Sequence, residues 1–203
     1  MLTLEHDLLL PLVNMALKNK DRPNLAGVHV APRGGFVSFY ATDGHRAARV
    51  DIETPEYDGF EEPFTVSAHG LKTVLQAAGK KGFVTLYRPV HGAGVPVVAT
   101  SKTAGDATFT LNEIDGKFPD VDRAAFGKVD DIKASYKYDA PTPAFDASYV
   151  KDAADFMQKV TGRKNAPLFI RLTGAGEVAL FTTDVKEVDD LKLAAFAVMP
   201  LRA

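Results

Sequence analysis

The feature that most constrains the fold of this chain is a pattern that occurs three times along it. Each copy has one short strand, one amphipathic helix and three further strands, and the copies follow one another at a period of about 60–75 residues. A unit of this kind cannot cover both faces of its own sheet, so it must pack against a neighbouring unit. The sequence therefore predicts an α+β protein built of three β-α-β-β-β repeats.

The predicted helices are recognised by apolar residues at a spacing of three and four, which places them on one helix face. Asp7, Ser67, and either Asp146 or Ser148 are the expected N-caps. The apolar stripes are Leu9, Leu12, Val13, Ala16 and Leu17 in the first copy, Leu71, Val74, Leu75 and Ala78 in the second, and Val150, Ala153, Ala154, Met157 and Val160 in the third.

The predicted strands are short runs bounded by glycine and proline. They cover residues 25–30, 36–41 and 46–53 in the first copy, 63–66, 83–88, 95–100 and 108–112 in the second, and 142–145, 168–172, 178–182 and 191–199 in the third. One further amphipathic strand, residues 132–138, has no helix attached. We expect a domain of two repeats over residues 1–120 and a reduced domain over 121–203, with one repeat and this extra strand.

Composition limits the classes of function that the chain can have. Lys and Arg number 24 against 26 Asp and Glu, a net charge of −2, so any contact with DNA must come from a segregated face. The absence of cysteine excludes disulfides and thiolate metal sites and fits a reducing compartment. The first residues lack the pattern of a signal peptide, and no apolar stretch is of membrane-spanning length. We expect a soluble, cytoplasmic protein with no membrane partner.

Motifs for catalysis are weak in this sequence. The five histidines (His6, His29, His45, His69 and His91) have no metal-ligand spacing, and there is no nucleophile elbow or phosphate loop. Asp43 and His45 lie two residues apart across a turn, which is a poor geometry for acting on one substrate. We therefore predict that the chain is not an enzyme and carries no cofactor or metal.

Two polar or proline-containing stretches stand out instead. Residues 41–47 (Ala-Thr-Asp-Gly-His-Arg-Ala) form a tight polar connection between two strands, with Asp-Gly supplying the turn. Residues 198–203 (Val-Met-Pro-Leu-Arg-Ala) follow an apolar strand. Each has a structural explanation on its own, as a hairpin turn and as an edge strand closed by proline.

Taken in order, several stretches resemble the bacterial DNA sliding clamps, the β subunit of DNA polymerase III. Residues 42–46 resemble the ATDGHR turn of that family, and residues 198–202 resemble its V-M-P-M-R ending. Gly116-Lys117-Phe118-Pro119-Asp120 with Arg123 is similar to its G-[RK]-F-P-D-Y-x-R junction between the middle and last domains. Residues 25–28 and 145–150 also match, and the matches keep the family's order along nearly the whole chain.

The resemblance implies a DNA-clamp fold of about one and a half clamp domains, with antiparallel sheets outside and helices lining a ring. It also implies a pocket that binds short peptide motifs of replication proteins. We expect it to be shallow, because Ala47, Ala124 and Ala203 are smaller than the residues usual in the family. By resemblance the pocket residues are Leu25, Thr42, Gly44, His45, Arg46, Pro119, Arg123, Val198, Met199, Pro200, Leu201 and Arg202.

The same resemblance implies contact with duplex DNA through the helices, by phosphate contacts that carry no sequence information. Basic residues gather on or just after the three predicted helices, although lysine-rich helix faces are also common in proteins that bind no DNA. The predicted DNA contacts are Lys18, Lys20, Arg22, Lys72, Lys80, Lys81, Lys151, Lys159, Arg163 and Lys164.

Rings of this family contain twelve repeats, so three repeats per chain predict four chains, closed head to tail. A trimer is the alternative, if residues 118–139 supply most of a half-domain. The implied partners are double-stranded DNA, a replicative DNA polymerase and a clamp loader, in the cytoplasm and at the nucleoid, and the short build would suit a phage or plasmid system. The competing interpretation is a monomeric, clamp-like adaptor or inhibitor that binds the same peptides without encircling DNA.

Overall fold

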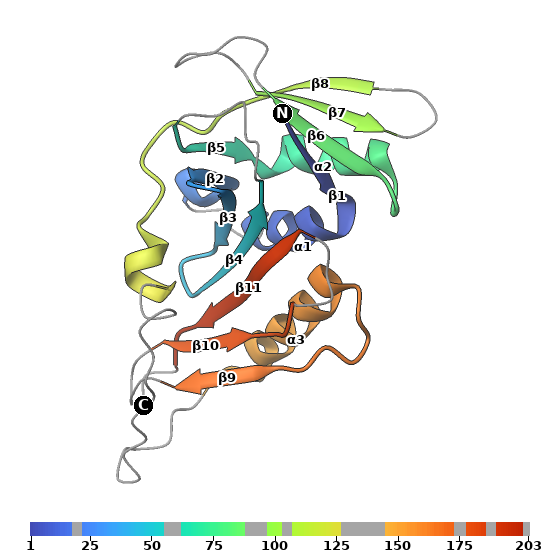
Figure 1. The fold of residues 1–203 in the computed structure, drawn as a ribbon. Coiled ribbons are helices and arrows are strands. Elements are labelled where there is room, and N and C mark those ends of the chain that lie inside the picture. Colours follow the sequence, from blue (N-terminus) through green and yellow to red (C-terminus); the bar gives the residue numbers. More distant parts are fainter. Residues whose placement is uncertain are drawn as a thin grey trace, which may run out of the picture.

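The computed structural model describes residues 1–17, 22–54, 62–87, 97–102, 107–126, 145–172, 178–185 and 190–200. It is a mixed α/β fold with antiparallel sheets (Figure 1). The elements are β1 (Leu2–Glu5), α1 (His6–Ala16), η1 (Pro23–Leu25), β2 (Gly27–Arg33), β3 (Phe36–Thr42), β4 (Arg46–Glu53), β5 (Phe64–Ser67), α2 (Ala68–Ala78), β6 (Phe83–Tyr87), β7 (Val97–Lys102), β8 (Ala107–Leu111), η2 (Asp122–Phe126), α3 (Ala147–Thr161), β9 (Phe169–Leu172), β10 (Ala179–Thr182) and β11 (Leu191–Val198).

The first two repeats exchange their first strands. The strand order is β1-β6-β7-β8 in one sheet and β5-β2-β3-β4-β11-β10-β9 in the other. β1, from the first repeat, pairs with β6 of the second, and β5, from the second repeat, pairs with β2 of the first. This reciprocal exchange explains why neither repeat is a complete layer by itself.

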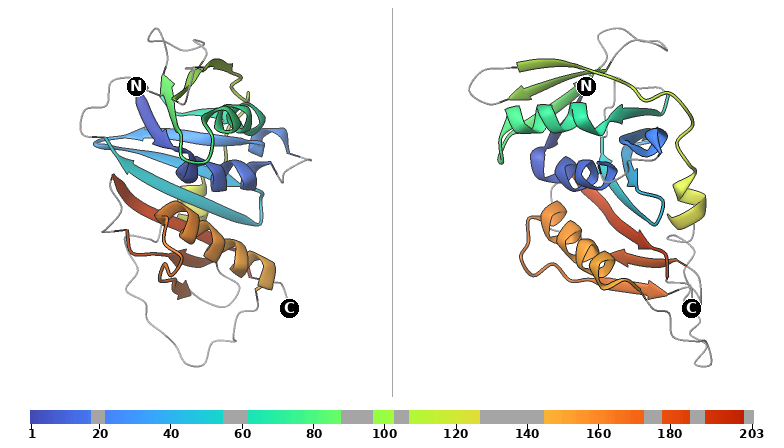
Figure 2. Two further views of the ribbon diagram at one scale, coloured as in Figure 1. Left: turned by 90° about the vertical axis from the view of Figure 1, so that its right-hand side faces the viewer. Right: turned by 180° about the vertical axis from the view of Figure 1, so that it is seen from behind.

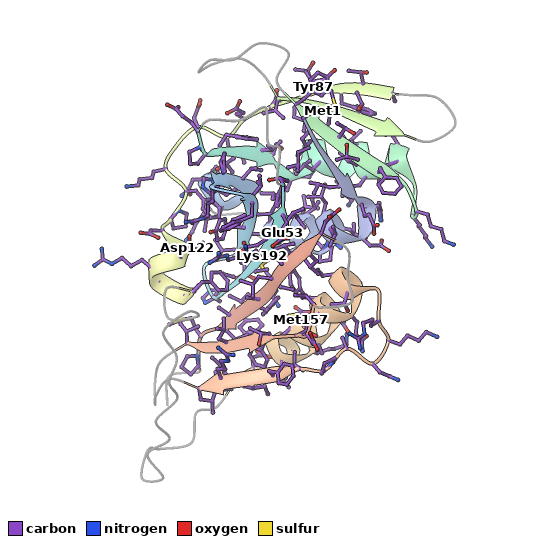
Figure 3. The ribbon with its side chains drawn as sticks, in the orientation of Figure 1. Met1, Glu53, Tyr87, Asp122, Met157 and Lys192 are labelled. Atoms are coloured by element: carbon purple, nitrogen blue, oxygen red, sulfur yellow. The ribbon has the colours of Figure 1, made fainter. Side chains whose placement is uncertain are left out.

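The third repeat joins the first through its last strand. β11 pairs antiparallel with β4, and Ala194 lies opposite Val50. At the end of this pair Lys192 and Glu53 approach to 3.5 Å, and Figure 3 shows the two labelled residues next to each other. The seven-stranded sheet is therefore continuous across the boundary between the two predicted domains.

All three helices lie on one side of the sheets. α1 packs against both α2 and α3, so the helices form a row in the order α2, α1, α3 (Figure 2, left). We call the sheet face toward the helices the inner face and the opposite face the outer face.

Along the strands of the large sheet, successive side chains point alternately to the inner and the outer face, and this creates two apolar cores. On β4 and β11, Val50, Ala194 and Phe196 belong to the inner core beneath the helices. Ala47, Ala195 and Ala197 belong to a smaller outer core with Leu25, Ala31, Tyr40, Phe118, Val121, Phe126 and Leu180. The outer core is closed by residues 118–126, which cross the outer face (Figure 1, yellow).

Most predicted element boundaries agree with the structure. The Ser67 cap is confirmed, since its side chain accepts a hydrogen bond from the Gly70 N–H, and Asp146 rather than Ser148 caps α3. The prediction of Asp7 as a cap is wrong, because α1 begins two residues earlier than expected: its N-cap position is Glu5, and Asp7 lies in the first turn. The predicted strand 132–138 and nearly all of 142–145 lie outside the described residues.

Candidate functional site

A cavity of about 320 Å³ opens on the outer face, and we call it the outer-face pocket. Segments far apart in sequence form it: residues 22–25, the β3–β4 turn, the end of β11, Val178 just before β10, and residues 116–126, which we call the connector. Its lining residues are Arg22, Asn24, Leu25, Thr42, Gly44, His45, Arg46, Ala47, Pro119, Val121, Ala124, Ala125, Val178, Ala197 and Met199.

The β3–β4 turn is held by its own polar side chains. The Thr42 hydroxyl donates to the Arg46 carbonyl at 2.7 Å and accepts from the Gly44 N–H at 3.1 Å. The Asp43 carboxylate accepts from the N–H groups of His45 and Arg46, both at 3.1 Å. Gly44 has φ +92°, a conformation that glycine adopts without strain. The turn thus presents its exposed residues, Gly44 and His45, at the pocket rim.

The end of β11 is fixed to this turn by backbone contacts. Ala197 lies opposite Ala47 in the β4–β11 ladder, and the Met199 N–H donates to the His45 carbonyl at 3.1 Å. Small side chains at Ala47 and Ala197 leave space on the floor of the pocket, while Met199 is 47% exposed at its edge. The result is an apolar floor beside a polar rim.

Arg46 is buried and joins the turn to the third repeat. Its Nε donates to Asp43 Oδ2 at 2.8 Å, and its Nη1 donates to Asp152 Oδ2 on α3. Its guanidinium also lies 4.6 Å from the ring centroid of Tyr149. Burial works against the charged form, but the hydrogen bonds and charges of Asp43 and Asp152 outweigh it and raise the pKa of Arg46. Arg46 therefore stays charged and holds two repeats together at the pocket wall.

The connector is attached to the sheet at its start by an aromatic contact. Phe118 stacks on His29, with ring centroids 4.6 Å apart and planes within 1°. Burial lowers the pKa of His29 to about 4, against the opposing charge of Asp122, so the ring is neutral near pH 7. A neutral ring can pack on Phe118 without the cost of a buried charge.

The middle of the connector is attached by a polar network around Asp122, which Figure 3 places on the side of the sheet away from the helices. Tyr40 donates its hydroxyl to Asp122 Oδ2 at 2.7 Å, and Arg49 Nη1 donates to Asp122 Oδ1 at 3.1 Å. Arg33 also donates to Asp122, and Arg49 is bound by both oxygens of Asp51 at 2.7 and 2.8 Å. Asp122 therefore receives three hydrogen bonds from the sheet.

The pKa shifts in this network keep Tyr40 and Arg49 in the protonated forms that donate its hydrogen bonds. Burial raises the pKa of Tyr40 to about 12, and its hydrogen bond to Asp122 adds to the effect. Burial opposes the charge of Arg49, but Asp51 and Asp122 outweigh it and raise the pKa of that guanidinium. Tyr40 thus remains a donor and Arg49 remains a cation around neutral pH.

The structure brings together seven of the predicted pocket residues: Leu25, Thr42, Gly44, His45, Arg46, Pro119 and Met199. It does not place Arg123, Val198 or Pro200 in the lining, and Leu201 and Arg202 lie outside the described residues. Val198 is fully buried in the inner core, because neighbouring strand residues face opposite sides of the sheet. A role in binding a peptide remains a prediction for the five residues Arg123, Val198, Pro200, Leu201 and Arg202.

Sequence reasoning missed several lining residues, and alternation could have found one of them. Ala197 faces the pocket because it is one residue from Val198 on the same strand. Arg22, predicted as a DNA contact, instead lines the pocket, and its Nη1 lies 2.7 Å from where a Cβ on Gly44 would be. Asn24, Val121, Ala125 and Val178 carried no sequence signal of their own.

The inner face holds the second candidate site, the predicted DNA surface. Lys72, Lys80, Lys81, Lys151, Lys159 and Lys164 are exposed on or after α2 and α3, and Arg163 is half-buried. Lys18 and Lys20 lie outside the described residues. α1 itself carries no Lys or Arg between His6 and Ala16.

Acidic side chains reduce the positive charge near α3. Lys151 forms an ion pair with Asp155, and Asp152, Asp155 and Lys159 line a groove of about 360 Å³ between α1 and α3. The basic charge of the described inner face therefore lies mainly beyond the ends of α2 and α3, where cations also suit the helix dipole.

Other kinds of site find no support in the part of the chain that the structure describes. None of its helices is both long enough and apolar enough to cross a membrane. Within the same residues, no group of three or more His, Cys, Asp or Glu side chains is placed to hold a metal ion.

Searches by sequence alone find no relatives: no protein-family model and no curated protein matches this chain. Solved structures do match. The DNA polymerase III subunit beta of Pseudomonas aeruginosa superimposes with a TM-score of 0.65 at 19% identity, over all of this chain and 67% of that one. The DNA polymerase sliding clamp of Bacillus subtilis gives 0.63 at 14% identity, over 99% and 64%.

The beta clamp of H. pylori, in complex with 5-chloroisatin, gives a TM-score of 0.64 at 12% identity, over 98% of this chain and 63% of that one. This chain thus spans about two thirds of the length of the clamp chains it matches. The predicted DNA-clamp fold is confirmed, with antiparallel sheets and few helices. At these identities the likeness shows the fold alone.

Proposed function

We propose that this protein is a DNA sliding clamp, a ring-shaped processivity factor that encircles duplex DNA and docks replication proteins in the outer-face pocket. The observation that carries the proposal is the pocket itself: on a clamp fold, the β3–β4 turn, the end of β11 and the connector converge on one cavity. In this role the protein is not an enzyme and needs no cofactor.

The chemistry of the pocket suits a short peptide. Its floor is apolar, at Leu25, Ala47 and Ala197, and its rim offers the charged Arg22 and the imidazole of His45. An apolar cavity with a few polar groups at its edge is the usual arrangement for catching an extended peptide, and about 320 Å³ accommodates a few side chains. The partners that fit are a replicative polymerase and a clamp loader that carry such motifs.

The inner face suits the binding of duplex DNA through its phosphates, without reading the base sequence. Exposed lysines on or after α2 and α3 can contact phosphates, and Lys18, Lys20 and Arg22 are further candidates. A homotetramer of twelve repeats is the favoured ring and a trimer the alternative. The setting we propose is the cytoplasm, at the nucleoid, in a phage or plasmid replication system.

Whether the protein encircles DNA as a ring is tested by measuring how long the protein is retained on DNA, in an assay that needs no clamp loader. Linear duplex DNA with biotin at both ends is incubated with the protein, streptavidin is then added to half of the sample, and both halves are passed through a sizing column in high salt. We expect the protein to stay with blocked DNA and to leave open-ended DNA, because salt weakens phosphate contacts but does not open a ring.

Equal retention on blocked and open DNA would contradict a topological clamp. Loss from both, with peptide binding intact, would instead support the monomeric adaptor or inhibitor.

Peptide docking is tested by filling the pocket. Ala124 is exposed on the connector and lines the cavity, so Ala124→Phe should occupy its volume without disturbing a core. We expect the affinity for a fluorescent peptide carrying a bacterial clamp-binding motif to fall at least about tenfold by anisotropy, close to 1.4 kcal/mol. Ala147→Phe, at an exposed position on α3 that does not line the pocket, is the matched control and should bind as wild type does. Unchanged binding by Ala124→Phe would place the peptide elsewhere.

A further inference from the structure

A second cavity, of about 480 Å³, lies where all three repeats meet, and we call it the seam groove. β1 and the start of α1 form one side of it, and Phe83 at the start of β6 lies at its edge. Ile52 near the end of β4, the last turn of α3 and Asp190 just before β11 form the other side. The bottom of the groove is apolar, because Leu4, Ile52 and Val160 are all buried there.

The seam groove lies at the far end of the strands that carry the outer-face pocket. β4 runs from Arg46 in the pocket to Ile52 in the groove, and β11 runs back from beside Asp190 to Ala197 in the pocket. Six residues of extended strand span about 20 Å. In Figure 1 the end of β1 lies on the right of the molecule and the connector on the left. A ligand in the groove therefore leaves the outer-face pocket free.

The rim of the seam groove is acidic. Glu5, Asp7 and Asp190 are exposed, and the lining residues offer one ammonium group against them, that of Lys159. Asp7 is 2.8 Å from His6, whereas the carboxylates of Glu5 and Asp190 have no hydrogen-bond or ion-pair partner among the described residues. Such a rim repels the phosphates of nucleic acids and attracts cationic side chains.

The register of β1 and β6 places one of these carboxylates beside an exposed aromatic ring. Glu5 lies directly opposite Phe83. On the same face Thr3 lies opposite Thr85, and their hydroxyl oxygens are 2.9 Å apart, so side chains of the two strands do meet here. Phe83 is 44% exposed, and no cation of the described residues lies over its ring. A carboxylate and a ring face are thus both available at the groove.

Elsewhere this chain fills such a pair of groups with an arginine of its own. Arg46 is held by carboxylates and lies 4.6 Å from the ring centroid of Tyr149. Arg49 is bound by Asp51 and lies 5.7 Å from the ring centroid of Tyr40. A planar guanidinium binds a carboxylate with its edge and a ring with its face at the same time, which a compact ammonium does less well. The seam groove has the same two groups without the arginine.

We infer that the seam groove binds an arginine-containing segment of a partner protein. The guanidinium pairs with Glu5 and lies over Phe83, and a neighbouring apolar side chain of the segment enters the cavity beside Leu8 and Val160. A second basic residue of the segment pairs with Asp190. This site is separate from the outer-face pocket, and the inference goes beyond the proposed function without depending on it.

The test is binding of a fluorescein-labelled peptide of alternating arginine and leucine, by anisotropy at about 0.15 M salt, which screens weak surface attraction. Glu5→Gln/Phe83→Leu removes the carboxylate and the ring and should weaken binding at least about tenfold. The matched control is Glu62→Gln/Phe169→Leu, which removes an exposed carboxylate and an exposed ring outside the groove and should bind as wild type does. Ala124→Phe, which fills the outer-face pocket, should also bind as wild type does.

Two further measurements keep the result specific. The single variant Glu5→Gln should give part of the loss, and it removes no capping bond, since the Glu5 side chain makes none. Urea denaturation of each variant shows whether the fold is intact. The same peptide with lysine in place of arginine should bind more weakly than the arginine peptide, because an ammonium does not lie flat on the ring.

The inference is overturned if wild-type protein does not bind the arginine peptide at about 1 mM, which corresponds to less than about 4.1 kcal/mol. An equal loss in the double variant and its matched control also overturns it, as does equal affinity for the lysine peptide. Loss of binding in Ala124→Phe would place the peptide in the outer-face pocket and reject the seam groove. Loss of the protein from blocked DNA, with this binding intact, would count against the clamp and not against the groove.

Discussion

Replacing Arg46 with methionine is expected to lower the free energy of unfolding by about 2–4 kcal/mol, one of the two largest effects of a single substitution that we predict. The Arg46 side chain is only 5% exposed and donates to Asp43 and Asp152. Methionine keeps much of the apolar stem but leaves two carboxylates without their cation. Asp152, at 33% exposed, regains some water, so the loss should fall below that of a fully buried pair.

Urea denaturation measures this change, and Lys192→Met is the matched control. Lys192 and Glu53 join the same two repeats across β4 and β11, but both are about half exposed and 3.5 Å apart. Their pair should contribute less than about 1 kcal/mol. Arg46→Lys should give an intermediate loss, because an ammonium cannot reach both carboxylates and lie over Tyr149 at once. If Arg46→Met costs no more than Lys192→Met, Arg46 does not join the repeats.

Much of the fold could be predicted from the sequence because the repeat is visible in the hydrophobic pattern. The strand 46–53 was predicted with the boundaries that the structure shows, since a polar turn precedes it and Glu53 ends it. The helix stripes of α2 were also correct, at Leu71, Val74, Leu75 and Ala78. These signals are local, and local patterns survive in a single sequence.

Strand exchange could not be predicted in the same way. Whether β1 pairs with β2 or with β6 depends on tertiary packing, and both choices satisfy the same alternation of Leu2 and Leu4. The cap of α1 was missed for a related reason: β1 runs directly into the helix at Glu5, so no loop separates them and the Asp7 signal was misleading.

The candidate pocket was predicted only in part, because some of its residues carry a local sequence signal and others do not. The β3–β4 turn and the Phe118-Pro119 junction are marked by residue types that a turn requires. Ala197 is marked only by its place in the alternation of β11, and Ala125 carries no signal of its own. Arg22 was assigned to the helix face from its place in sequence, but it occupies the N-cap position of η1 and lies next to Gly44 in space. The Asp122 network joins residues 73 to 89 positions apart, which no local pattern reveals.

Replacing Asp122 with alanine is expected to weaken peptide binding at least about tenfold and to lower the free energy of unfolding by about 2–3 kcal/mol. Without this carboxylate, the hydroxyl of Tyr40 and the guanidinium groups of Arg33 and Arg49 lose an acceptor that lies on the connector. A partly buried donor without an acceptor costs more than a lost surface contact, since it is also cut off from water.

The effect on binding follows from where the connector lies. Val121, Ala124 and Ala125 form one wall of the outer-face pocket, and Asp122 is the residue among them that is hydrogen-bonded to β2, β3 and β4. Without the hydrogen bonds of Asp122 this wall should become mobile. Ordering the wall on binding then lowers the net free energy of peptide binding. Anisotropy with the labelled peptide and urea denaturation, both on the same preparation, measure the two effects.

Asp115→Ala is the control, at an exposed acidic residue outside this network, and it should change neither quantity. Tyr40→Phe removes one of the three donors and should give part of both effects, and in Tyr40→Phe/Asp122→Ala the losses should be less than additive because they share one hydrogen bond. A stability loss in Asp122→Ala with unchanged peptide affinity would show that Asp122 secures the fold without positioning the pocket wall. Additive losses in the double variant would show that Tyr40 and Asp122 act separately.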